Sequence, residues 1–182
     1  MKPHSAGHIH VMREPMDEKA LVLFANEART FVSWARGEDG VAMDVRSALL
    51  RILALYQAAL FLPHPWTEGM NSELAQADLS ENELASVQHR ASQLPCQSYL
   101  EIFDPYENPA EPVMGHLTDD IGDIYRDIAR GLILFNRGQH DEALWEWGYN
   151  LQIHWGEHAT GAIRALHAHL VQENPDALAS HA

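Results

Sequence analysis

Hydrophobic residues recur every three or four positions along most of the chain, the spacing that places them on one side of an α-helix. This pattern predicts five helical segments, over about residues 17–36, 41–62, 80–94, 118–137 and 140–171. No segment clearly predicts a sheet, and SYLEIF at 98–103 fits either a short extended piece or a helical turn. We therefore expect an all-α protein, an irregular bundle of five or six helices with a C-terminal antiparallel helical hairpin.

Glycine and capping residues mark the ends of these predicted helices. The string SENE predicts a capping box, in which the side chains of Ser80 and Glu83 bind each other's backbone amides. Gly138 is a natural stop for the helix that precedes it. Glycine costs about 1 kcal/mol against alanine inside a helix, so internal glycines predict a kink or a close backbone approach. The last predicted helix contains three of them, Gly148, Gly156 and Gly161.

The predicted helices form a single domain, which we expect to span residues 15–173 between a flexible N-terminal tail (1–14) and a C-terminal tail (174–182). Inside it, DPYENPAEP (104–112) contains three prolines and is expected to be an ordered, extended connector on the surface. The most apolar stretch, ALLRILALYQAALFL, is too short for a membrane span. The first residues carry no apolar core of a signal peptide, and the single Cys96 can form no intrachain disulfide, so we expect a cytoplasmic protein.

Charge limits the partners of the chain. It has 26 acidic residues against 12 lysines and arginines, a formal net charge of -14, and no basic stripe. A field of this sign repels phosphate, so we expect neither nucleic acid nor a membrane surface as partner. Trp34, Trp66 and Trp145 exceed what one modest core must hold, which favours a homodimer or another protein partner.

The string HWGEH is the first candidate for chemistry. His154 and His158 lie four residues apart, so they project from one side of a helix, on the stripe that also carries Trp147 and Leu151. We expect both histidines to be buried, and buried imidazoles need partners for both ring nitrogens, which requires either a metal or a polar network. An acid near the start of the helix at 118–137, or in DPYENPAEP, could approach the imidazoles and fix their tautomers. The string also matches the inverted zinc-protease pattern, with Glu157 activating water, but no suitable third ligand follows it.

The string DDIGDIYRD is the second candidate. Its four acids are Asp119, Asp120, Asp123 and Asp127. They match the DDxxD motif that holds magnesium in isoprenoid synthases, but the second acidic motif of those enzymes is absent. Two interpretations stay open: a solvated face paired with nearby arginines, or an interface along which the acids meet a cation or an arginine.

These two strings carry a resemblance to a known family. DPYENPAEPVMGHLTDDIGDIYRDIARGL, followed by WEWGYNLQIHWGEHATGAIRALH, resembles an uncharacterised bacterial family known only as a domain of unknown function. DDIGDIYRDIARGL and HWGEH are its most specific strings, and the resemblance covers roughly residues 98–170. It implies a small, soluble, all-helical bacterial protein and supplies no activity, substrate or cofactor.

Two functions therefore remain. The first is a non-catalytic helical module that binds a partner or forms a homodimer, needs no cofactor and uses the histidines structurally. The second is a metal-binding or metal-dependent hydrolytic protein that holds a divalent ion with His154 and His158. The sequence slightly favours the first, because no catalytic constellation is complete. For the second, the candidate metal ligands besides the histidines are Asp119, Asp123 and Glu157, with Glu107 and Glu111 as further possible carboxylates.

Overall fold

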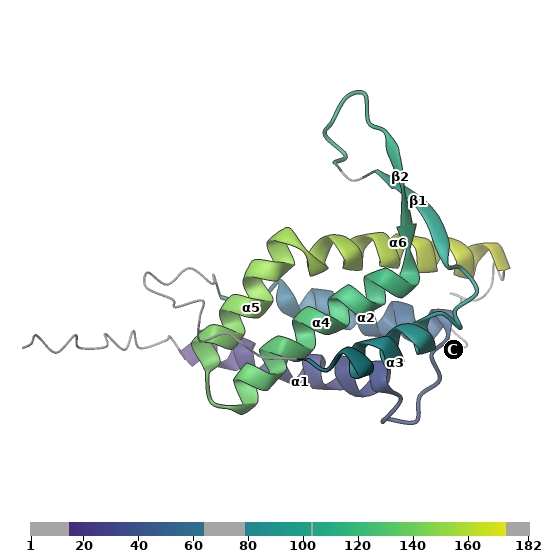
Figure 1. Ribbon diagram of the computed structural model, residues 1–182. Helices are drawn as coiled ribbons and strands as arrows, with labels where there is room; N and C mark the ends of the chain where they lie inside the picture. The colour runs from purple at the N-terminus through teal and green to yellow at the C-terminus, as the bar shows by residue number, and fades with distance from the viewer. Residues whose placement is uncertain (1–14, 64–78, 103, 174–182) are drawn as a thin grey trace, which may run out of the picture.

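The computed structural model describes residues 15–63, 79–102 and 104–173, and its helices form one bundle (Figure 1). The predicted tails lie outside these residues. The elements in chain order are α1 (Pro15–Arg36), α2 (Val45–Ala59), α3 (Glu81–Ala91), β1 (Ser98–Ile102), β2 (Pro112–His116), α4 (Leu117–Asn136), α5 (His140–Ile153) and α6 (Trp155–Glu173). The predicted bundle of five or six helices is thus confirmed, with six helices in the described part of the chain.

The helix α4 is the centre of the bundle and packs against α1, α3, α5 and α6. Its apolar stripe is buried in the core, as the spacing predicts, and consists of Ile121, Ile124, Tyr125, Ile128 and Leu132. α4 and α5 form the predicted C-terminal helical hairpin, and the turn between them uses Gly138 at a φ of 77°. That left-handed conformation is cheap only for glycine, which explains the stop.

Close contact between α4 and α5 depends on one glycine. A Cβ on Gly131 would lie 2.1 Å from Nε1 of Trp147, so only glycine leaves room for the indole. The same Nε1 donates a hydrogen bond to the carbonyl of Ile128 at 3.0 Å. Trp147 also meets Phe24 of α1 edge-to-face, with ring centroids 4.8 Å apart. The indole therefore ties α1, α4 and α5 into one core.

The ends of the helices differ from two predictions. Ser80 is the N-cap of α3, but its side chain makes no capping bond, so the predicted Ser80–Glu83 box is wrong. The Glu83 carboxylate instead turns inward, to Arg36 of α1 and Tyr125 of α4. A capping box forms at α2, where the side chains of Asp44 and Ser47 bind each other's backbone amides.

Residues 98–116 form a β-hairpin, which corrects the expectation of no sheet. The strands β1 and β2 are antiparallel, with Tyr99 opposite Gly115 and Leu100 opposite Met114. The proline-rich segment forms the loop of this hairpin and projects from the bundle, so it is not a connector lying on the bundle surface (Figure 1). Short strands whose apolar residues point outward carry no periodic signal of a buried face, which is why the pattern missed them.

The last predicted helix is broken in two. His154 lies between α5 and α6 with φ −149° and ψ −87°, far from helical values. Gly156 follows the break, and a Cβ there would lie 2.0 Å from the carbonyl oxygen of Leu151. The kink that the internal glycines predicted is therefore confirmed, and it is tight enough to need glycine at this position.

The tryptophans give less support to a homodimer than the sequence indicated. Trp34 is fully buried in the core of the monomer. Trp145 is half-buried and stacks on Tyr149, with ring centroids 4.9 Å apart. Trp66 lies outside the described residues. Among the helices of the described ranges, none is long and apolar enough to cross a membrane.

A polar network ties three helices together beneath the bundle surface. The Tyr125 hydroxyl, on α4, donates to the Glu83 carboxylate at 2.8 Å and accepts from Nε of Arg36 at 2.9 Å. Arg36 and Glu83 also form an ion pair. Tyr125 is fully buried, and burial raises the pKa of its hydroxyl to about 12, so the group stays neutral and bridges the two charges.

Replacing Tyr125 with phenylalanine is expected to lower the free energy of unfolding by about 1 to 2 kcal/mol, because it removes both bonds of a buried hydroxyl and leaves two charges less well paired. Urea unfolding followed by circular dichroism measures this difference. Tyr106→Phe is the matched control, since Tyr106 is 94% exposed. Equal stability of the two variants would contradict a stabilising role for the network.

Candidate functional site

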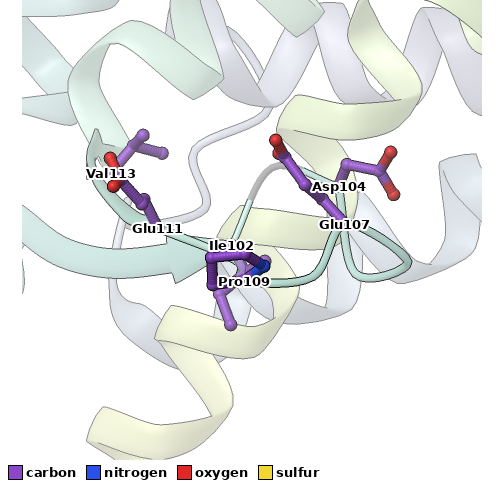
Figure 2. A pocket seen from close by; sticks show the side chains of 6 residues that line it. All are labelled: Ile102, Asp104, Glu107, Pro109, Glu111 and Val113. Atoms are coloured by element: carbon purple, nitrogen blue, oxygen red, sulfur yellow. The ribbon is translucent and has the colours of Figure 1, made fainter.

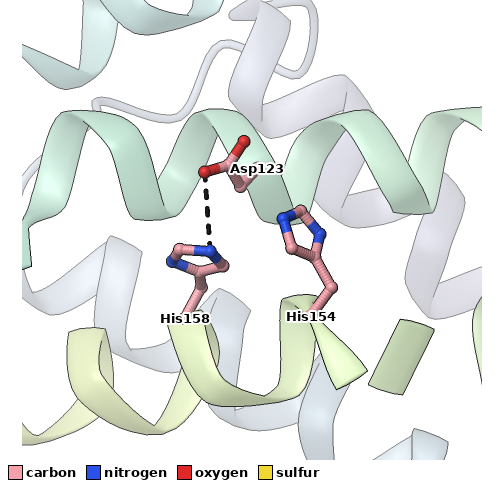
Figure 3. Close-up of side chains that lie close together, drawn as sticks. All are labelled: Asp123, His154 and His158. Atoms are coloured by element: carbon pink, nitrogen blue, oxygen red, sulfur yellow. Dashed lines mark ion pairs between the residues drawn. The ribbon is translucent and has the colours of Figure 1, made fainter. Parts of the chain in front are cut away.

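The two histidines of HWGEH meet the acidic face of α4 (Figure 3). His154 lies at the break between α5 and α6, and His158 lies one turn later on α6. Their rings are 5.0 Å apart and nearly perpendicular. Asp123 projects toward them from α4, and one potential ligand atom from each of the three side chains lies within 4.8 Å of the other two. The sequence predicted this packing of the two segments, and it is confirmed.

Each histidine is held from behind by a buried carboxylate of α4. Nδ1 of His154 lies 2.7 Å from Oδ2 of Asp127, and Nδ1 of His158 lies 2.9 Å from Oδ1 of Asp120. Both aspartates are only 3% exposed. Ionised carboxylates can only accept hydrogen bonds, so each Nδ1 carries the proton and donates it. The Nε2 atom of each neutral imidazole then has a free lone pair.

The free nitrogens face the open side of the site. Nε2 of His158 lies 3.5 Å from Oδ2 of Asp123, the contact drawn in Figure 3. The side chains of His154 and His158 are 36% and 30% exposed, so the expectation that both are buried is wrong in degree. Their Nδ1 edges are covered by α4, while part of each ring remains in reach of solvent. The site is therefore accessible to a small ligand.

A third layer of support comes from the hairpin. The Tyr99 hydroxyl, on β1, donates to Oδ2 of Asp120 at 2.8 Å, so Asp120 is bound on both oxygens. Two glycines make room for this tyrosine. A Cβ on Gly115 would lie 2.5 Å from the Tyr99 ring, and one on Gly161 would lie 2.5 Å from its hydroxyl oxygen. Gly161 is thus the close approach that the internal glycines predicted, here between α6 and a strand.

Charge and burial set the protonation of the cluster. The hydrogen bond to Asp120 raises the pKa of His158, helped by the charge of Asp123 and opposed by burial. Burial raises the pKa of Asp127, although the bond from His154 lowers it in part. The first shift therefore comes from a hydrogen bond to a carboxylate, and the second from the burial of a carboxylate.

Glu146 adds a buried acid beside this cluster. It lies on α5 and is 6% exposed. Burial raises its pKa to about 7, the negative charge of Asp127 adds to this, and Arg130 opposes it. Glu146 was not predicted as a site residue, because a glutamate within an otherwise helical stretch gives no sign of burial.

The structure brings together part of the predicted ligand set. His154, His158 and Asp123 converge. Asp119 and Glu157 are exposed and do not belong to the converging group. The two further carboxylates considered from the sequence, Glu107 and Glu111, lie on the hairpin around its loop and away from the histidines.

The acidic face of α4 was also misjudged in part. The solvated-face interpretation is wrong for Asp120 and Asp127, which are buried against the histidines. An acid near the start of this helix was expected to approach the imidazoles, and Asp120 does so, whereas Asp127, two turns later, was not expected as a histidine partner. Their spacing held a usable signal: acids at 120, 123 and 127 recur every three or four residues along one helix face, and His154 and His158 lie four residues apart.

The donor set is two imidazole nitrogens and one carboxylate oxygen. This combination suits divalent transition ions such as zinc, manganese, iron or cobalt. Three protein ligands leave at least one coordination position for water or another small molecule. The remaining side chains of the cluster, Asp120, Asp127 and Tyr99, orient the ligands and need not touch the ion.

Comparison with known proteins gives the family and the fold. Residues 17–172 match the model of a family described as a domain of unknown function, DUF5063. The crystal structure of protein BF1032 from Bacteroides fragilis superposes with a TM-score of 0.68 at 21% sequence identity. The match covers 82% of this chain and 91% of that one, and at this identity it supports the fold alone. No curated protein matches the chain. The predicted resemblance is therefore confirmed, and the chain belongs to the DUF5063 family.

Proposed function

We propose that this protein binds a divalent transition-metal ion through His154, His158 and Asp123. The observation that supports it most is the pair of buried carboxylates, Asp127 and Asp120, each bonded to the Nδ1 of one histidine. Histidines that bind metals usually donate their second nitrogen to a carboxylate in this way, which fixes the ring and makes it a better ligand.

The distances support the same proposal. Two ligands on a tetrahedral ion with bonds of about 2.1 Å lie roughly 3.4 Å apart. Nε2 of His158 and Oδ2 of Asp123 are 3.5 Å apart, close to that value. The other separations reach up to 4.8 Å, so one side chain must turn slightly inward when an ion binds.

Repulsion between the acids gives a reason for a cation. Asp120, Asp123 and Asp127 follow one another at three- and four-residue spacing, and like charges so placed destabilise a helix. Arg126 pairs with Asp123 at 2.7 Å and compensates one of them from the solvent side. A divalent ion between the histidines and Asp123 would compensate the cluster from the inside.

The proposal can be tested by zinc titration of the full-length chain with His4, His8 and His10 replaced by asparagine, which removes competing ligands near the N-terminus. Isothermal calorimetry should give one site per chain. His158→Ala should weaken zinc binding by about a hundredfold, because it removes a ligand. Asp127→Asn should weaken zinc binding by about tenfold, because it leaves the ligand His154 in place but holds it less firmly.

Thermal unfolding provides an independent measure. Chelator should lower the melting temperature. Zinc at about a hundred times its dissociation constant should restore it, by raising the free energy of unfolding by roughly 3 kcal/mol. His167→Ala is the control, since His167 lies exposed on the same helix. If chelator and zinc leave the melting temperature unchanged, the histidines form a structural network and the metal proposal is wrong.

A second candidate function is docking of a partner protein, the role that the sequence favoured. It rests on a separate surface, the exposed face of the β-hairpin, which carries apolar side chains without a described neighbour to cover them. Neither function excludes the other, because the hairpin face and the histidines lie on different sides of β1.

A further inference from the structure

The two faces of the hairpin have different roles. Tyr99, opposite Gly115, points toward α6 and Asp120 and so anchors the hairpin to the bundle. Alternate residues in a strand point to opposite sides, so Leu100 and Ile102 point away from the bundle, with Met114 beside Leu100. These three side chains are 62%, 45% and 58% exposed. We call Leu100, Ile102 and Met114 the outer face of the hairpin.

An outer face of this kind is unusual for a surface hairpin. A two-stranded sheet normally keeps polar residues on the side that faces water. Here the outer face is apolar, and both strands also have an edge that pairs with no other strand in the described chain. Exposed apolar groups and free strand edges together are typical of sites that bind another polypeptide.

Acidic residues lie at the loop end of this outer face, next to Ile102. Around the loop, Asp104, Glu107 and Glu111 line a hollow of about 390 Å³ whose walls are Ile102, Pro109 and Val113 (Figure 2). In this view the apolar Ile102 and Pro109 lie between the carboxylates of Glu111 and those of Asp104 and Glu107. The sequence of residues 98–116 contains no lysine or arginine, so no basic group of the hairpin neutralises them.

Charge complementarity decides which partner fits. A second copy of this chain would bring the same carboxylates against each other, and such like-charge contacts disfavour association. Nucleic acid and anionic membranes are repelled for the same reason, given the net charge of -14. A segment with lysine or arginine side chains satisfies the acids, and the aliphatic stems of those side chains suit the apolar walls of the hollow.

We propose that the outer face of the hairpin binds a partner protein through a segment that combines basic and apolar residues. The apolar residues pack on Leu100, Ile102 and Met114, and the basic residues reach Asp104, Glu107 and Glu111. The proposal rests on the second candidate function and does not require a bound metal, because none of these residues belongs to the group formed by His154, His158 and Asp123.

The test uses the full chain and a fluorescein-labelled probe peptide of ten residues that alternates lysine and valine, with a lysine–serine peptide of the same length and charge as comparison. Fluorescence anisotropy at about 0.15 M salt measures binding. The lysine–valine peptide should bind about tenfold more tightly than the lysine–serine peptide. The double variant Leu100→Ser, Met114→Ser should remove that difference, and Glu107→Gln, Glu111→Gln should weaken both peptides.

Matched controls separate the hairpin from the rest of the surface. The control for the apolar change is Leu50→Ser with Leu53→Ser on α2, since these leucines are 56% and 42% exposed. The control for the charge change is Glu18→Gln with Glu27→Gln on α1. Both should bind the probe within twofold of the unchanged chain. The far-UV circular dichroism and urea midpoints of the hairpin variants should match those of the unchanged chain, which shows that they fold.

Two results would overturn the proposal. If both peptides bind equally, or if the hairpin and control variants behave alike, the probe is bound by net charge and not by the outer face. If sedimentation shows a dimer of the unchanged chain that Leu100→Ser, Met114→Ser converts into a monomer, the outer face binds a second copy and not a basic partner.

Discussion

Gly156→Ala is expected to lower the free energy of unfolding by about 3 kcal/mol, which is large for the addition of one methyl group. The added Cβ would lie 2.0 Å from the carbonyl oxygen of Leu151, a backbone atom that cannot turn aside. Relief therefore requires the break between α5 and α6 to open. That movement shifts His154 away from Asp127, so the variant should also bind zinc less tightly wherever it remains folded.

Urea unfolding measures the effect, and Gly138→Ala is the matched control. Gly138 has a φ of 77° but no atom within 4 Å of an added Cβ. Its replacement should therefore cost only the backbone strain, about 1 to 2 kcal/mol. If Gly156→Ala is no more destabilising than Gly138→Ala, the break does not require the close contact with Leu151.

Glu146→Gln is expected to stabilise the protein at pH 8 by roughly 2 to 3 kcal/mol and to have no such effect at pH 4. The carboxyl is 6% exposed, and burial raises its pKa from 4.5 to about 7. The folded chain therefore binds more protons than the unfolded chain between these values, so stability falls as the pH rises through this window. Above it the carboxylate is ionised in both states and the full cost of burying the charge remains.

Chemical unfolding at a series of pH values between 4 and 8 measures the difference between Glu146→Gln and the unchanged chain. Glu142→Gln removes the same charge from the same helix at a partly exposed position and should change stability by less than about 0.5 kcal/mol. A Glu146→Gln protein that is less stable at pH 8 than the unchanged chain would contradict the account of a buried charge.

The helices were predictable because each has an apolar face that the bundle buries. The stripe on α4 is the clearest case, since its isoleucines recur every three or four residues and all enter the core. The hairpin was not predictable in this way. Its pairing joins Ser98 to His116, far apart in sequence, and its apolar side chains face outward, so neither periodicity nor burial marks the strands.

The site was predictable in part for a related reason. The interval between His154 and His158 places both on one side of a helix, which is a local property of the chain. The way α6 lies against α4 cannot be predicted from the helical spacing, because it depends on the break at His154 and on the close contact at Gly156. The placement of α6 buries Asp120 and Asp127, while Asp119, about 100° from Asp120 around α4, stays exposed.

The hydroxyl of Tyr99 links the hairpin to His158, because both bind the carboxylate of Asp120. A displacement of β1 from α6 would withdraw this hydroxyl from Asp120 and loosen the carboxylate that orients His158. Any ligand that holds His158 in place must, by thermodynamic reciprocity, also hold the hairpin in place, with the same coupling free energy in both directions. Binding of a ligand at His158 and binding of a partner at the hairpin are therefore coupled. In the described structure the coupling passes through the hydrogen bond from Tyr99 to Asp120.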